Sequence, residues 1–147
     1  MANYRSILAI LLAFVTTLLV SCSSPVKAKP PTYTSTQLEQ IQTYQSDLNA
    51  MQQRLPELAK LIQDREWTNT RNFIHGPLGE LRTTSSRLIR NLLPKDQPEA
   101  EKLSKKVFGS LIKIDVAAEA TNYDLAIRSY GELQRDLNAF FQLLPQG

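Results

Sequence analysis

The chain has 147 residues, which is enough for one domain of ordinary size and too few for two. Its 17 Lys and Arg against 14 Asp and Glu give a formal charge of +3, and 42% hydrophobic with 21% charged residues is typical of a globular protein. So small a net charge argues against nucleic-acid binding. Because the chain has one cysteine and one histidine, it cannot form an internal disulfide, a cysteine-rich metal site or a metal motif with two histidines.

Residues 1–21 have the features of a cleaved signal peptide. One positive charge, Arg5, precedes the apolar run 7–20, which as a helix spans roughly 21 Å and falls short of the hydrocarbon core of about 30 Å. Residues 19–22 read LVSC, which resembles the lipobox of bacterial lipoproteins and implies cleavage before Cys22 and acylation of that residue. A plain secretory signal or an uncleaved N-terminal anchor remain the alternatives.

Residues 22–34 are predicted to form a lipid-anchored, extended linker. The stretch CSSPVKAKPPTY contains three prolines and no apolar periodicity, which favours a polyproline-like conformation. Several acyl chains on Cys22 would hold the protein stably at a bilayer, whereas a single chain binds reversibly.

A first helix is predicted from a capping box at Thr36-Gln37-Leu38-Glu39 to about Ile62, with a kink at Pro56. Its apolar residues recur at steps of three and four, which places them on one helical face. They are Leu38, Ile41, Tyr44, Leu48, Met51, Leu55, Leu58 and Ile62.

A second helix is predicted from about Glu66 to Pro94, with an interruption at Gly76-Pro77. Its face consists of Trp67, Ile74, Leu78, Leu81, Ser85, Leu88 and Leu92.

The third helix is predicted to start at a cap on Asp96, with Pro98 in its first turn, and the fourth to start at a cap on Thr121 or Asn122 and to end at Pro145. The face of the third consists of Ala100, Leu103, Val107, Leu111, Ile114 and Ala118. The face of the fourth consists of Ala126, Tyr130, Leu133, Leu137, Phe140 and Leu144.

The pattern predicts an all-α fold, an up-down-up-down four-helix bundle over residues 35–147. Short connections make consecutive helices antiparallel neighbours, and stripes spaced by three and four suit packing near 20°. Sustained period-two alternation is absent and glycine is scarce at five residues, so strands are not expected.

Several segments in order resemble the PsbQ-like extrinsic subunits of photosystem II, in their cyanobacterial lipoprotein form. They are Trp67, IHGPLGELR at 74–82, LLPKD at 92–96, IDVAA at 114–118 and FFQLLP at 140–145, together with the lipobox. The resemblance covers about residues 36–145 and rests on the order of the segments, since none is a catalytic signature.

The resemblance implies a protein on the lumenal side of the thylakoid membrane, beside the photosystem II core and the other lumenal extrinsic subunits. There it would help to stabilise the oxygen-evolving manganese–calcium centre and its chloride. It implies no enzymatic activity and no cofactor. The alternative is an unrelated cell-envelope lipoprotein whose helical bundle binds a metal or a small ligand.

Catalytic and metal chemistry finds little support in the residues. A Cys-x-x-Cys-His haem attachment is absent, and of the two candidate axial ligands, His75 and Met51, the latter lies on an apolar stripe where core packing is expected. Asn72, three residues before His75, excludes the Glu-x-x-His motif of di-iron bundles. No serine has the local setting of a nucleophile elbow. We therefore expect no catalytic residue and no metal site.

Basic side chains are the candidate partner-binding residues. Arg71, His75 and Arg82 lie on one side of the second helix, at 100° per residue. For His75 three roles are open: a docking contact, an isolated metal ligand at the surface, or a ring that fills the bend at Gly76-Pro77. A second exposed stripe on the third helix consists of Lys102, Lys106 and Lys113. Each stripe suits an acidic partner surface, and the alternative for each is a solvated face whose long stems cover the core edge.

Overall fold

A computed structural model describes residues 31–145, and within them it contains helices and no strand. The predicted signal peptide at 1–21, the lipid site at Cys22 and the linker up to residue 30 lie outside the described residues. The helices are α2 (Ser35–Gln53), α3 (Leu55–Gln63), α4 (Trp67–His75), α5 (Leu81–Asn91), α6 (Gln97–Glu119) and α7 (Tyr123–Leu143). None of the helices in this range is long and apolar enough to cross a membrane.

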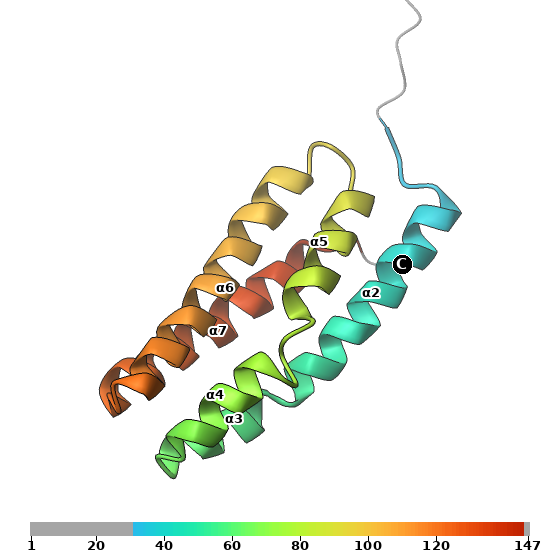
Figure 1. Cartoon of the computed structure of the whole chain (residues 1–147). Helices are drawn as coiled ribbons and strands as arrows, with labels where there is room; N and C mark the ends of the chain where they lie inside the picture. Colours follow the sequence, from blue (N-terminus) through green and yellow to red (C-terminus); the bar gives the residue numbers. More distant parts are fainter. Residues whose placement is uncertain (1–30, 146–147) are drawn as a thin grey trace, which may run out of the picture. The chain divides into compact units, whose positions relative to one another are not determined.

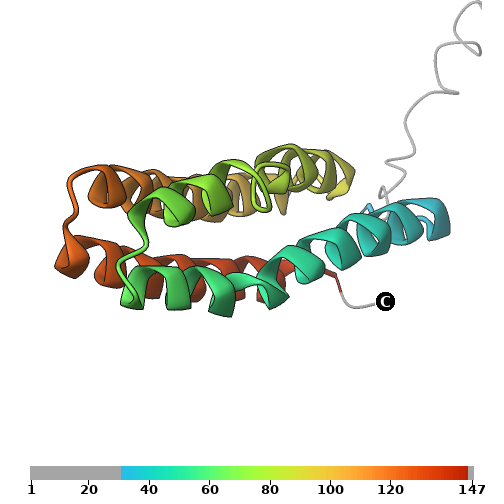
Figure 2. The ribbon, with the colours of Figure 1, turned by 60° about the horizontal axis from the view of Figure 1, so that its bottom comes forward.

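The helices form the four arms of an up-down-up-down bundle (Figure 1). The first arm consists of α2 and α3, the second of α4 and α5, the third of α6 and the fourth of α7. The second arm packs along the first and against α6, and α7 packs along α6 and against α3. Figure 2 shows two layers, with α4, α5 and α6 in one and α2, α3 and α7 in the other. The predicted fold class is confirmed.

The first arm breaks where the sequence predicts a kink. α2 ends at Gln53, and α3 begins at Leu55 with Pro56 in its first turn. Because proline lacks a backbone N–H and crowds the preceding turn, it suits the start of a helix and disrupts its interior. The junction is tied to the fourth arm, since the Tyr130 hydroxyl donates to the Leu55 carbonyl oxygen at 3.1 Å.

The second arm breaks at the predicted interruption, and the irregular stretch extends from residue 76 to 80. The chain folds back closely here: a Cβ on Gly79 would lie 2.6 Å from the carbonyl oxygen of His75. Real Cβ atoms do not approach backbone that closely, so the bend requires glycine at this position.

The predicted residues of the first capping box are wrong. The capping box of α2 uses Thr34 and Gln37 in place of Thr36 and Glu39: the Thr34 hydroxyl accepts from the Gln37 amide at 3.2 Å, and the Gln37 side chain accepts from the Thr34 amide at 3.0 Å. The backbone of Thr34 is still extended, so the helix starts at the earlier of two overlapping patterns.

Asp96 precedes α6 as predicted, but its side chain does not cap the helix. Its carboxylate instead accepts from the Tyr33 hydroxyl at 2.8 Å, and the same hydroxyl accepts from the Leu93 amide at 3.2 Å. At α7 the cap is Asn122, whose side chain accepts from the Leu125 amide at 3.0 Å.

The predicted apolar faces of α6 and α7 are buried at every position, and they meet the first two arms in one core. In the first arm Leu38, Tyr44 and Met51 are only partly buried. The periodicity of apolar residues missed Thr70, which is fully buried. Burial is possible because its hydroxyl donates a hydrogen bond to the Glu66 carbonyl oxygen at 3.0 Å.

Candidate docking surface

A groove runs along the bundle between α4 and α5 on one side and α6 on the other; we call it the α4–α6 groove. It consists of three adjoining hollows of about 490, 380 and 330 Å³. His75 borders the first and the second hollow, and Arg82 and Phe108 border the second and the third. The three predicted residues of the second helix, Arg71, His75 and Arg82, therefore all lie along this groove.

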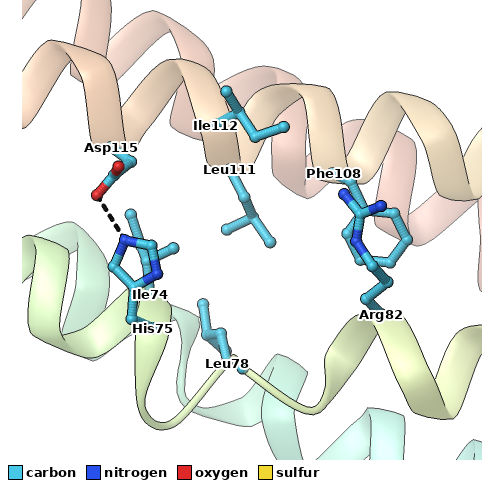
Figure 3. Close-up of a pocket in the computed structure, with 9 residues that line it drawn as sticks. Ile74, His75, Leu78, Arg82, Phe108, Leu111, Ile112 and Asp115 are labelled. Carbon is cyan, nitrogen blue, oxygen red and sulfur yellow. Dashed lines mark hydrogen bonds and ion pairs between the residues drawn. The ribbon is translucent and has the colours of Figure 1, made fainter.

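Asp115 on α6 organises the boundary between the first and the middle hollow. Its Oδ1 accepts from Arg71 Nε at 3.1 Å. The same oxygen lies 3.0 Å from His75 Nε2, the contact that Figure 3 marks. Arg71 also reaches Glu119, with 3.9 Å between Nη1 and Oε1. The His75 side chain is 67% exposed, so the ring lies across the groove toward α6 and does not fill the bend at Gly76-Pro77.

The middle hollow is apolar at its floor. The buried residues Ile74, Leu78 and Leu111 line it, and Ile112 stands at its edge with 56% of its surface exposed (Figure 3). Among the described residues the exposed large hydrophobic side chains are Ile112 and, one turn further on, Val116 at 51%. An apolar side chain held in water next to an apolar hollow is typical of a surface that a partner covers.

The third hollow is basic. The Arg82 guanidinium lies 4.6 Å from the centre of the Phe108 ring, a cation–π contact that forms the wall shared with the middle hollow. Arg90 and Lys105 also line the third hollow, with Glu101 as its one carboxylate. None of these three cations makes a salt bridge to any residue between 31 and 145.

The predicted lysine stripe on α6 lies outside the α4–α6 groove, and two of its three lysines form ion pairs at the surface. Lys102 pairs with Glu99 in its own helix at 3.1 Å, and Lys113 pairs with Glu132 of α7 at 2.8 Å, where the hydrogen bond from Lys113 lowers the pKa of the Glu132 carboxyl. Lys106 is exposed and lines none of the three hollows.

Sequence reasoning missed Arg90, Lys105, Phe108 and Ile112. A search for charges along single helices does not find a groove made by two arms. The available signal was Ile112 itself, an isoleucine outside the buried stripe of α6.

Within the range 31–145 no three His, Cys, Asp or Glu side chains come together as a metal site would require. His75 and Asp115 form a pair without a third ligand, and Arg71 already holds the same carboxylate oxygen. The groove is therefore suited to binding by shape and charge.

Comparison with known proteins gives two matches over nearly the whole chain. The family model PsbQ, described as oxygen evolving enhancer protein 3, matches residues 2–145. The protein named CyanoQ from Synechocystis sp. is 42% identical over 147 residues, which cover 99% of each chain.

Proposed function

Because the chain belongs to the PsbQ family and is an extrinsic accessory subunit of photosystem II, associated with its lumenal side, we propose that it is held there by lipid on Cys22 and supports the manganese–calcium–chloride centre without catalysing a reaction. The observation that supports this most strongly is that the match extends from residue 2 to 145 and is not confined to one motif. The alternative of an unrelated lipoprotein with a ligand in its bundle is not favoured.

The described structure is compatible with a binding role. Its core is packed with apolar side chains, and charged and polar side chains line the α4–α6 groove at the surface. A rigid bundle of this kind contributes by occupying and stabilising a site on a larger complex, and we assign the docking contacts Arg71, His75 and Arg82 to that groove.

The lipid anchor is proposed from the sequence at residues 19–22. If the linker is extended, the twelve residues 22–33 reach roughly 35 Å at about 3.1 Å per residue. Such a tether confines the bundle to a thin layer above the membrane and raises its effective concentration at the photosystem, so a modest docking interface is sufficient.

Replacing Cys22 by Ala behind an unrelated export signal tests the anchor. We expect the occupancy of purified photosystem II to fall by about tenfold at low protein concentration and to recover when the soluble variant is added in excess. Ser24→Ala in the native chain is the matched control and should leave occupancy unchanged. Equal occupancy of the Cys22→Ala and native chains, or a mass spectrum showing an unmodified thiol at the native N-terminus, would refute the proposed anchor.

A further inference from the structure

We propose that the α4–α6 groove docks a protein segment of photosystem II that inserts an apolar side chain beside Ile112 and places a carboxylate among Arg82, Arg90 and Lys105. The inference rests on the proposed function and deepens it, because it assigns the docking face and the chemistry of the docked segment. It follows from two neighbouring features of the groove, one apolar and one basic.

The apolar feature is the middle hollow. Its floor consists of the buried side chains Ile74, Leu78 and Leu111, and Ile112, which is 56% exposed, extends the same apolar surface outward into solvent. Covering Ile112 removes apolar area from water, which is the main favourable term in protein association. The hollow, about 380 Å³, has room for one large side chain.

The basic feature is the third hollow. Three cations surround one carboxylate, Glu101, and none of the three makes a salt bridge to a residue described by the structure. In the first hollow, by contrast, the carboxylates of Asp115 and Glu119 already face Arg71. Positive charge is therefore in excess over the single carboxylate at the α5 end of the groove, where an acidic side chain would be attracted.

Arg82 connects the two features. Its guanidinium lies 4.6 Å from the centre of the Phe108 ring at the boundary between the hollows, and this contact favours that position. A planar, always charged guanidinium held in this way is suited to binding a carboxylate through two parallel hydrogen bonds. An incoming segment would thus place its apolar side chain on one side of Arg82 and its acidic group on the other.

The same features argue against two other occupants. A second copy of this chain, docked through Ile112 and Val116 with its α6 parallel to the first, would bring the cations of the two grooves together, and they would repel. A lipid acyl chain needs a long apolar channel, whereas this hollow is bounded by the polar pair of His75 and Asp115 at one end and by Arg82 at the other.

The test is rebinding of the lipidated protein to photosystem II purified from cells that lack it. Ile112→Ser is expected to weaken binding by about tenfold and Lys105→Gln by about threefold, the latter with a reduced sensitivity to salt. Two neighbours on α6 that line none of the hollows provide matched controls, Val116→Ser for Ile112 and Lys106→Gln for Lys105. Each control is expected to change the affinity by less than about twofold. All four positions are exposed, so the thermal melts of the variants should coincide with the wild type.

The outcomes separate the two proposals. If the wild type binds but Ile112→Ser and Lys105→Gln bind like their controls, the groove is not the docking face and the proposed function stands. If the wild type itself does not rebind, the proposed function fails. Binding of mature Cys22→Ala chain to anionic vesicles that depends on Ile112 and Lys105 would overturn the protein occupant, as would a dimer in sedimentation that Ile112→Ser dissolves.

Discussion

The hydroxyl of Tyr130 holds the fourth arm of the bundle to the break in the first, and its removal is the most informative test of the fold. The hydroxyl donates to the Leu55 carbonyl oxygen at 3.1 Å and accepts from Gln134 Nε2 at 3.0 Å, while the residue is only 7% exposed. Tyr130→Phe keeps the ring and its packing and removes both hydrogen bonds. The change therefore isolates the polar contribution at the junction between α2 and α3.

The expected cost follows from these two contacts. A typical intramolecular hydrogen bond contributes about 1 kcal/mol net, and the Gln134 amide is only partly buried, so water replaces its lost partner. We expect the free energy of unfolding at pH 7 to fall by about 1 to 1.5 kcal/mol. For a domain of this size that corresponds to a decrease in Tm of roughly 3 to 7 °C.

The same residue gives the effect a pH signature. Burial raises the pKa of Tyr130 above its ordinary value of 10.0, so the folded state favours the neutral phenol. When the pKa of a group is higher in the folded state than in the unfolded state, the group contributes its full stability below the unfolded-state pKa. This contribution is lost as the pH rises through the folded-state pKa. The wild type should therefore exceed Tyr130→Phe in free energy of unfolding by a constant amount up to about pH 9, and this advantage should decrease above pH 10.

Urea unfolding followed by circular dichroism measures both the loss in free energy of unfolding at pH 7 and its dependence on pH. Tyr44→Phe is the control, because Tyr44 also packs against the core, and its hydroxyl has no hydrogen-bond partner between residues 31 and 145. This variant should differ from the wild type by less than about 0.5 kcal/mol. Equal stability of the Tyr130→Phe and Tyr44→Phe variants at pH 7 would refute the contact between α7 and the junction.

Three further substitutions test other parts of the structure. Asp115→Asn removes the negative charge that contacts Arg71 and His75, and it should lower the free energy of unfolding by about 1 kcal/mol in urea titration. Glu99→Gln on the exposed face of α6 is the control and should leave the free energy of unfolding unchanged. Gly79→Ala sets a Cβ against the His75 carbonyl and should cost about 1 to 3 kcal/mol by the same measurement; an unchanged midpoint would contradict the close approach. Leu133→Ala empties a fully buried position and should cost about 2 to 5 kcal/mol, and a smaller loss would place α7 outside the core.

Much of the fold follows from local patterns in the sequence. The stripes of α6 and α7 are buried in full, and of the two predicted interruptions Pro56 lies in the first turn of α3 and Gly76-Pro77 follows the end of α4. Such features depend on a few consecutive residues, so the sequence alone reveals them. The role of Asp96 does not: its position predicts a cap, but its carboxylate binds Tyr33, which is 63 residues away and comes near only in the folded bundle.

The candidate site was predictable only in part for the same reason. Arg71, His75 and Arg82 share a side of the second arm, and the sequence places them together. The side chains that they contact, Asp115 and Phe108, lie on α6, and the register of α6 against the second arm is set by packing. The stripe of three lysines stays a prediction, and the pairing of Lys113 with Glu132 of α7 is a contact between two helices that no local pattern in the sequence reveals.

The contact between Tyr33 and the corner of α5 and α6 has a mechanical consequence. Tension transmitted along the chain toward α2 reaches Tyr33 two residues before the helix begins at Ser35. The load then passes to Asp96 and Leu93 as shear across two hydrogen bonds. The first turn of α2 is shielded from unwinding, because such a pull reaches the bundle at the corner where the second and third arms meet.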